Sequence, residues 1–258
     1  MQLPISPSAH LIPMRLDLYL VERNFAGSRT EAKRIILENC VSVRGKVITK
    51  PAFDISPDET EISVAENTKK YASRGGLKLE CAMSAFDFTV KDKLALDVGA
   101  SSGGFTDCLL QNGAKHVISV DSGFGQIAEF LRRDSRVTVI EKYNARYMKS
   151  EDFEYVPNLA VMDVSFISST YIIPALYNVL SDGADFICLI KPQFEVGRSA
   201  LGKNGIVKDE KHRQYAIQKV TEFAKAQGFS VAGVITSSIE GGDGNIEYLA
   251  HFKKKGKK

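Results

Sequence analysis

From residue 76 to the C-terminus, short apolar runs rich in β-branched residues alternate with amphipathic stretches of helical spacing. The apolar runs include KLALDVGA, HVISVDSG, NLAVMDVSF and ADFICLIKPQ. This alternation is typical of a mostly parallel β-sheet with helices covering both faces. The sequence therefore predicts a Rossmann-like, doubly wound α/β domain, and ligands of such domains bind at the carboxyl ends of the strands.

The N-terminal part of the chain has a different pattern, with short helical stretches followed by short β-rich stretches. Ser28 and Glu31 form a capping box, and Ala32 and Ile35 follow at helical spacing, which predicts a helix over residues 29–39. The Arg-Gly pair of VRGKVITK predicts a hairpin turn. The predicted helix and hairpin together carry a cluster of basic residues, which either contacts an anionic partner or is simply solvated. Its positive charge comes from Arg29, Lys33, Arg34, Arg44, Lys46 and Lys50.

This change of pattern divides the chain. Residues 14–65 are expected to form a small α+β domain, and residues 76–258 the larger α/β domain. The polar stretch ENTKK lies between them and predicts a linker over residues 66–75. Residues 1–13 contain three prolines and little periodicity, so we expect a disordered lead-in there.

Composition argues against several classes of protein. The net charge of +3 permits an anionic partner without requiring one. The four cysteines are far apart, with no C-x-x-C pair, so neither a metal site nor a disulfide framework is expected. The chain shows no signal-peptide pattern and no apolar run of about 18 residues. We therefore expect a cytoplasmic protein that does not bind a membrane.

The stretch ALDVGASSGGFTDCLL has the composition of a ligand-binding turn between a strand and a helix. It lacks the G-x-G-x-x-G spacing of a dinucleotide site and the G-K-[ST] of a phosphate loop. Asp97 in this turn and Asp121 at the end of the next strand would instead suit an ammonium group and a ribose, which S-adenosylmethionine carries. A purely structural turn is the alternative. The predicted cofactor-binding residues are Asp97, Gly99, Ser101, Gly103, Gly104, Phe105 and Asp121.

Four charged residues stand near the same predicted edge of the sheet. Asp163 and Lys191 each follow an apolar strand. Glu247 opens the last strand, which must be antiparallel to reach that edge, and Lys78 precedes the first strand. Any one of them could be an ordinary surface residue, but their convergence at the cofactor edge predicts a reactive site.

The segment RLDLYLVERNFAGSRTEAKRIILENCVSVRGKVITKP resembles the small RNA-binding module that is named after a ribosomal small-subunit protein. That module occurs in pseudouridine synthases, tyrosyl-tRNA synthetases and several RNA methyltransferases. The shared features are R-L-D, S-R-x-x-A-x-x-I and V-x-V-x-G. The resemblance implies RNA contact through Arg15, Arg29, Lys33, Arg34, Arg44 and Lys46, and Arg74 beside the reactive site is expected to add to it.

The larger domain is similar to the TlyA family, also called hemolysin A, whose catalytic domain resembles FtsJ-type ribose methyltransferases. The motifs YASRGGLKLE, DVGASSGGFTD, DVSFIS, LIKPQFEVGR, KNGIV and GNIEYLAHFKK occur in the family's order. The resemblance implies methyl transfer from S-adenosylmethionine to the 2′-hydroxyl of cytidines in ribosomal RNA, with ribosomal RNA or ribosomal subunits as partners. The family's catalytic tetrad falls on Lys78, Asp163, Lys191 and Glu247 without departure.

Several alternatives stay open at this level. Lys191 would act on the hydroxyl either as a base or as an orienting group, because burial and a second lysine lower its basicity while two carboxylates raise it. A non-catalytic RNA-binding protein of the same fold is the main alternative function. A cytolysin and an NAD oxidoreductase are less favoured, since no membrane-binding segment and no dinucleotide spacing are evident.

Overall fold

The computed structural model describes residues 12–37, 39–64, 70–241 and 244–256, apart from the side chains of Thr30, Arg34 and Lys203. The chain divides between Lys69 and Lys70 into two compact units. The predicted lead-in lies outside the described residues, except for its last two positions.

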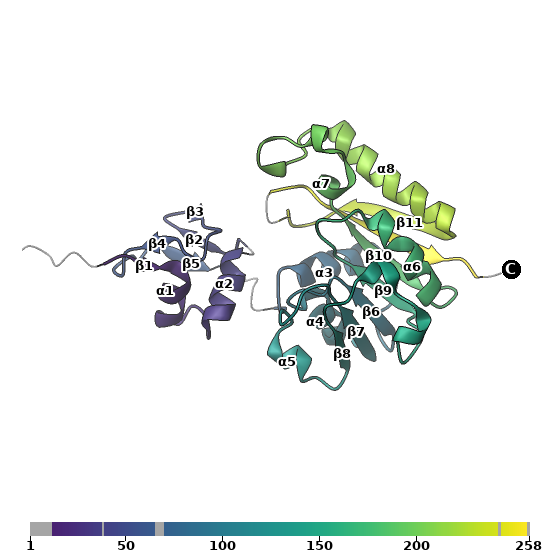
Figure 1. Ribbon diagram of the computed structural model, residues 1–258, viewed down its shortest axis with the longest axis horizontal. Helices are drawn as coiled ribbons and strands as arrows, with labels where there is room; N and C mark the ends of the chain where they lie inside the picture. Colours follow the sequence, from purple (N-terminus) through teal and green to yellow (C-terminus); the bar gives the residue numbers. More distant parts are fainter. Residues whose placement is uncertain (1–11, 38, 65–69, 242–243, 257–258) are drawn as a thin grey trace, which may run out of the picture. The chain divides into compact units, whose positions relative to one another are not determined.

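The N-terminal unit is a small α+β fold, as predicted (Figure 1). Strands β3, β2 and β5 form an antiparallel sheet in that order, and β1 pairs with β4. Between β2 and β3, Arg44 and Gly45 both have positive φ, at 50° and 73°, as a two-residue hairpin turn requires. The elements are β1 (Met14–Arg15), α1 (Leu16–Glu22), α2 (Arg29–Leu37), β2 (Val41–Val43), β3 (Lys46–Val47), β4 (Asp54–Ile55) and β5 (Ile62–Val64).

The C-terminal unit is built on a seven-stranded sheet in the order β11-β12-β10-β9-β6-β7-β8 (Figure 1). The strands from β10 to β8 are parallel, and β12 runs antiparallel to both β10 and β11. The predicted doubly wound, mostly parallel sheet is thereby confirmed. Its strands are β6 (Leu94–Val98), β7 (His116–Val120), β8 (Val137–Ile140), β9 (Leu159–Met162), β10 (Asp185–Ile190), β11 (Phe229–Thr236) and β12 (Tyr248–Lys254).

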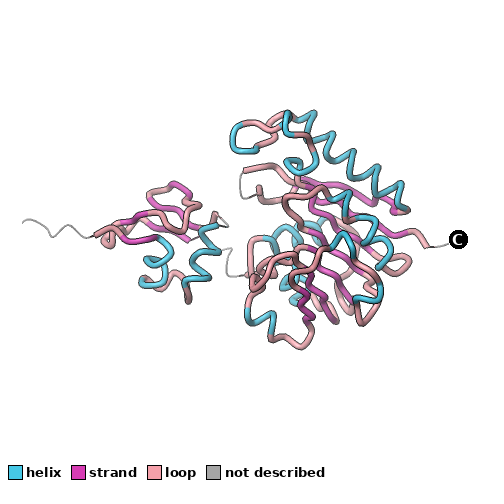
Figure 2. Tube along the Cα trace, in the orientation of Figure 1, coloured by secondary structure: helices cyan, strands magenta, loops and turns pink. Residues whose placement is uncertain are grey.

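Helices cover both faces of this sheet (Figure 2). Alternate residues of β6 belong to different cores, with Leu96 in one and Ala95 in the other, as the two-residue period of a strand requires. The helices α6 and α8 pack in the first core, and α3 and α4 in the second. No described helix is both long and apolar enough to cross a membrane. The helices of this unit are α3 (Gly75–Ala85), α4 (Gly104–Gln111), α5 (Glu129–Arg132), α6 (Ile173–Val179), α7 (Pro192–Glu195) and α8 (Glu210–Gln227), with 3₁₀ turns η2 (Ala145–Tyr147), η3 (Ser150–Asp152), η4 (Ser169–Tyr171), η5 (Arg198–Ala200) and η6 (Lys203–Gly205).

The segment predicted as a linker, residues 66–75, extends too far toward the C-terminus. Tyr71 and Ala72 are buried in the larger unit, and the backbone N–H of Ala72 donates to Asp107 Oδ2 at 2.7 Å. The first residue of α3, Gly75, also falls within the predicted linker. Burial of Tyr71 and Ala72 against α4 removes apolar surface from water and so stabilises the larger unit. The polar residues on the N-terminal side of this pair made the whole stretch look like a linker.

Candidate active site

Two ion pairs meet at the edge of the sheet where β9 and β10 end. Lys191 Nζ lies 2.5 Å from Asp163 Oδ1, and Lys78 Nζ lies 2.6 Å from Glu247 Oε2. The side chains of Lys78 and Glu247 are 9% and 2% exposed, whereas those of Lys191 and Asp163 keep 12% and 21%. All four predicted residues are therefore brought together, and the Asp163–Lys191 pair is the more accessible of the two.

Strand register explains this convergence. Because β9 and β10 are parallel, Asp163 after β9 and Lys191 after β10 leave the sheet at the same edge. In the antiparallel pair β10–β12, Tyr248 lies opposite Ile190, so Glu247 reaches that edge from the opposite chain direction. The remaining lysine of the cluster comes from α3, which contacts β12.

Electrostatics fix the state of Asp163. Burial by itself would raise the pKa of this carboxyl, but the ammonium groups of Lys191 and Lys78 outweigh burial and hold the pKa below its usual value. Asp163 is thus ionised at neutral pH. Lys191 Nζ also donates to Ser165 Oγ at 2.8 Å, so the lysine has two polar neighbours that define its direction.

A cavity of about 680 Å³ opens beside Asp163. Cofactor and substrate clefts usually have volumes of about 300–1,000 Å³, so this space can hold a nucleoside-sized ligand. Gly99, Ser101 and Asp121 line the cavity, as predicted for cofactor contacts, whereas the other four predicted cofactor residues do not. Those four are Asp97, Gly103, Gly104 and Phe105, all of them buried.

The glycines of the turn are required by contacts within the protein. Gly99 and Gly103 have φ of +85° and +92°, which disfavours any residue with a Cβ. A Cβ at Gly99 would lie 2.3 Å from the carbonyl oxygen of Asp163, and one at Gly104 would lie 2.2 Å from Ser73 Oγ. The glycines let the turn pack against the segment after β9 and the start of α3, and among them Gly99 also lines the cavity, where the sequence predicts close approach to a ligand.

Two carboxylates of the site have different surroundings. Asp97 is fully buried; its Oδ2 accepts from Thr106 Oγ1 at 2.7 Å, and its Oδ1 has no hydrogen-bond partner among the described residues. Burial raises the pKa of Asp97 to about 7. Asp121 accepts from the backbone N–H of Ser101 at 2.8 Å and of Gly123 at 2.7 Å, and each of its oxygens keeps a second lone pair for a ligand hydroxyl. Asp121 thus has acceptor capacity on the wall of the cavity, whereas the unpartnered Oδ1 of Asp97 is buried and Asp97 is not among the lining residues.

The chain is similar in sequence and fold to known proteins. The FtsJ-like methyltransferase family matches residues 71–254, and the S4 domain matches residues 14–60. The 16S/23S rRNA (cytidine-2′-O)-methyltransferase TlyA of Mycobacterium tuberculosis is 40% identical over 91% of this chain and 88% of that protein. The chain belongs to the TlyA family of FtsJ-like methyltransferases. A candidate rRNA methyltransferase of Bacillus subtilis, YqxC, is 46% identical over 92% of this chain and 85% of its own length. A solved structure of a candidate hemolysin from Streptococcus thermophilus is 43% identical, with a TM-score of 0.75 over 95% of this chain and 90% of that one.

In the S4 domain of this TlyA-family chain, the predicted RNA-binding arginines also make internal ion pairs. Arg15 Nε and Arg29 Nε lie 2.9 and 3.0 Å from the two oxygens of Asp17, which is fully buried. Hydrogen bonds from Arg15 outweigh burial and, with those from Arg29, lower the pKa of Asp17 to about 2. Arg44 Nη2 lies 2.7 Å from Glu59 Oε2. These guanidinium groups are held in fixed directions, and all three side chains remain 40% or more exposed.

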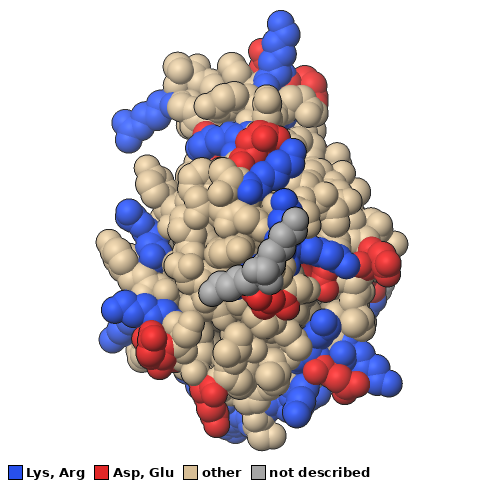
Figure 3. Space-filling model, turned by 90° about the vertical axis from the view of Figure 1, so that its right-hand side faces the viewer, with Lys and Arg blue, Asp and Glu red and all other residues tan. Residues whose placement is uncertain are grey.

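The predicted RNA-binding lysines, Lys33 and Lys46, are exposed, and the side chain of Arg34 lies outside the described structure. In the catalytic unit, Arg74 donates through Nη2 to the carbonyl of Glu240 at 3.3 Å and is one helical turn before Lys78. On the face drawn in Figure 3, basic and acidic side chains are interspersed. Charge on that face therefore marks no broad RNA-binding patch.

Sequence reasoning missed one wall of the cavity of this TlyA-family domain. Residues 142–146, which follow β8, line it, and Asn144 Oδ1 accepts from the backbone N–H of Arg146 at 3.1 Å. Phe166, on the segment after β9, also lines the cavity; it is 91% exposed and has a φ of +64°. The rule used for Asp97 and Asp121 would have found the first segment, because β8 is the next parallel strand and ends at the same edge.

Proposed function

We propose that this chain transfers the methyl group of S-adenosylmethionine to the 2′-hydroxyl of a cytidine in ribosomal RNA. The observation that carries this proposal is the cluster of Lys78, Asp163, Lys191 and Glu247 beside a nucleoside-sized cavity. Membership of the TlyA family and the activity for which the Mycobacterium tuberculosis relative is named support the reaction and the substrate. The S4 domain supports RNA as the partner.

The cavity and its carboxylates fit the cofactor. Asp121 would accept hydrogen bonds from the ribose hydroxyls, Asp97 would balance the ammonium group directly or through water, and Gly99 and Ser101 would contact the ligand from the turn. When bound, S-adenosylmethionine supplies an electrophilic methyl carbon on a positively charged sulfur. Gly103, Gly104 and Phe105 contribute by shaping the turn.

Lys191 is the residue that would meet the ribose hydroxyl. It lies at the accessible ion pair, and an ionised Asp163 at 2.5 Å stabilises its ammonium form. This favours the orienting role over the base role: Lys191 would donate to the hydroxyl oxygen and hold it in line with the methyl carbon, and Asp163 and Ser165 hold Lys191. As the O–C bond forms and the S–C bond of the donor breaks, the hydroxyl proton would leave to water. The Lys78–Glu247 pair is more deeply buried and would help to hold the Asp163–Lys191 pair in place.

The reaction is tested by incubating the purified chain with tritiated S-adenosylmethionine and with separated small subunits, large subunits and naked ribosomal RNA. We expect label at the 2′ position of a cytidine. Binding of RNA without any transfer to the three substrates would instead support the non-catalytic RNA-binding alternative. Lysis of erythrocytes by the same preparation would support the cytolysin alternative. We also propose a cytoplasmic location, because ribosomal RNA, the proposed substrate, is found there.

The raised pKa of Asp97 predicts how cofactor binding depends on pH. Below about pH 7 the folded, unliganded protein holds a proton on Asp97 that an ammonium ligand must displace. We therefore expect the affinity for S-adenosylmethionine to rise by up to about tenfold per pH unit until about pH 7 and then to level off.

The same raised pKa affects stability. Between the usual Asp pKa and about 7 the unfolded chain binds fewer protons than the folded chain, so raising the pH lowers the unfolding free energy. Calorimetric titration of wild type and Asp97→Asn checks this; an equal pH dependence in both would contradict it.

Two lysines of the S4 domain should contribute to RNA binding mainly through phosphates. Lys33→Ala and Lys46→Ala should each weaken binding to ribosomal RNA and reduce the slope of log affinity against log salt by about 1. Fluorescence anisotropy over a range of salt concentrations measures this slope. Lys225→Ala, which removes an exposed lysine paired with Glu222 on α8, is the matched control and should leave the slope unchanged. Unchanged slopes in all three variants would show that these S4 lysines do not contact phosphates.

A further inference from the structure

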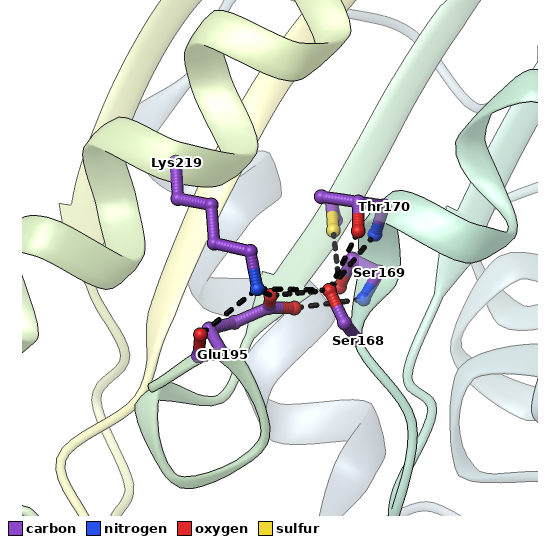
Figure 4. A network of polar contacts seen from close by, with 6 residues as sticks. Ser168, Ser169, Thr170, Glu195 and Lys219 are labelled. Carbon is purple, nitrogen blue, oxygen red and sulfur yellow. Dashed lines mark hydrogen bonds and ion pairs between the residues drawn. The ribbon is translucent and has the colours of Figure 1, made fainter. Parts of the chain in front are cut away.

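A buried polar cluster lies next to the proposed active site but takes no part in the proposed chemistry (Figure 4). We call Ser168, Ser169, Glu195 and Lys219 the Glu195 cluster. Ser168 Oγ donates to Glu195 Oε2 at 2.5 Å, and the backbone N–H of Ser169 donates to Glu195 Oε1 at 2.7 Å. Lys219 Nζ, from α8, donates to Glu195 Oε2 at 3.0 Å, to the Glu195 carbonyl at 2.8 Å and to Ser168 Oγ at 3.3 Å.

The cluster joins the two segments that carry the accessible ion pair. Ser168 and Ser169 lie five and six positions after Asp163, on the segment that follows β9. Glu195 lies four positions after Lys191 and ends the short helix that follows β10. The two segments are therefore connected twice. The first connection is the Asp163–Lys191 ion pair at the edge of the sheet, and the second is the Glu195 cluster, four to six residues further along each segment.

Burial makes this second tie specific. The side chain of Glu195 is 1% exposed, and both its oxygens are hydrogen-bonded. A buried carboxylate is unfavourable unless donors surround it, and an apolar contact of similar volume would give at least as much stability. The carboxylate instead imposes direction, because its two oxygens accept from one segment while its own backbone belongs to the other.

We propose that Glu195 is a positioning residue, which fixes the separation and angle of Asp163 and Lys191 by clamping the segment after β9 to the segment after β10. Lys219 neutralises the charge of the Glu195 carboxylate and connects the cluster to α8. This inference rests on the proposed function, because it matters only if the Asp163–Lys191 pair meets the substrate. It gives the FEVGR motif, which the proposed reaction leaves without a role, a defined one at Glu195.

The test compares the kinetics of the full-length chain with Glu195→Gln, which keeps the shape of the side chain and removes its charge. We expect kcat for methyl transfer to fall by about 10- to 100-fold, since displacement of a catalytic group by about 1 Å has an effect of that size. The Kd for S-adenosylmethionine and the KM for RNA should change less than about threefold, because the cluster does not line the cavity. Lys219→Met should behave in the same way, and Lys219→Arg should restore most of kcat.

A matched control lies at the other end of the same strand. Asp185 opens β10 and its Oδ1 lies 2.8 Å from Nε2 of the buried His251, so Asp185→Asn also disrupts a buried polar pair. It should lower the melting temperature without lowering kcat per folded molecule. If Glu195→Gln keeps the wild-type kcat, or if Asp185→Asn loses as much kcat as Glu195→Gln does, the positioning role is wrong.

Two further measurements keep the outcome clear. Should Glu195→Gln fail to fold, Ser168→Ala removes one hydroxyl of the same cluster and should still reduce kcat by several-fold; a wild-type kcat in that variant overturns the inference. A crystal structure of the variant gives a readout that needs no activity: the Lys191 Nζ to Asp163 Oδ1 distance should lengthen, and an unchanged distance overturns the proposal. If wild-type protein transfers no methyl group to ribosomal RNA, the proposed function fails, and the structure of the variant still decides the clamp.

Discussion

Replacing Lys191 with alanine should reduce methyl transfer to ribosomal RNA by about 10²-fold or more, as expected when the reacting hydroxyl is no longer held in line with the methyl carbon. The physical reason is that no other described side chain beside Asp163 combines this position with a positive charge directed by two neighbours. Single-turnover assays with tritiated cofactor measure the rate. Binding of S-adenosylmethionine should change by less than about threefold, because Lys191 does not line the cavity proposed to hold the cofactor.

The matched control for this variant is Ser165→Ala, which removes one acceptor of Lys191 Nζ and leaves the ion pair with Asp163. It should lose far less activity, on the order of tenfold, as expected for a single orienting hydrogen bond. Robust methylation by Lys191→Ala would show that this lysine does not act on the hydroxyl. For an orienting ammonium group, the wild-type rate should also stay level from about pH 7 to 9, whereas a lysine base would give a rate that rises with pH.

Replacing Lys78 with methionine should destabilise the fold as well as the reaction. The variant leaves the carboxylate of Glu247, 2% exposed, without its ammonium partner, and breaking a buried ion pair in this way costs about 3–5 kcal/mol of unfolding free energy. For a chain of this size that corresponds to a melting temperature lower by roughly 10 °C. Calorimetry or circular dichroism measures the shift.

The double variant Lys78→Met/Glu247→Leu separates stability from function. With both charges removed, most of the lost stability should return, because apolar side chains of similar volume can replace a buried pair. Methyl transfer should stay low, since Lys78, which together with Lys191 lowers the pKa of Asp163, no longer contributes its charge to the site. A stable double variant with wild-type activity would mean that the Lys78–Glu247 pair is only structural.

Strand periodicity was sufficient to predict the edge of the sheet where the site lies. Asp97, Asp121, Asp163 and Lys191 each follow an apolar run, and parallel strands bring such positions to one edge whatever the loops between them do. The antiparallel last strand followed from the position of Glu247 alone. The family motifs then identified the reaction, but they carried no information on which lysine pairs with which carboxylate.

The glycine turn shows where sequence reasoning reached its limit. The sequence shows that the turn lacks the spacing of a phosphate loop. It does not show the packing contacts that require glycine at these positions. Gly99 is needed because the carbonyl of Asp163, far along the chain, packs against it. Contacts of this kind depend on how two distant segments meet, which local propensity cannot encode.

The sequence by itself determined the fold class and the edge of the sheet that holds the candidate site, and it supplied the residue types expected to carry the chemistry, because strand and helix periodicity are local properties. Only the tertiary structure decided the pairing of Lys78 with Glu247 and of Lys191 with Asp163, the anchoring of Arg15 and Arg29 on Asp17, and the clamp at Glu195. Apart from Arg15 and Asp17, which are two positions apart, these pairings form between residues that are distant along the chain, and their direction and burial arise when the segments pack together.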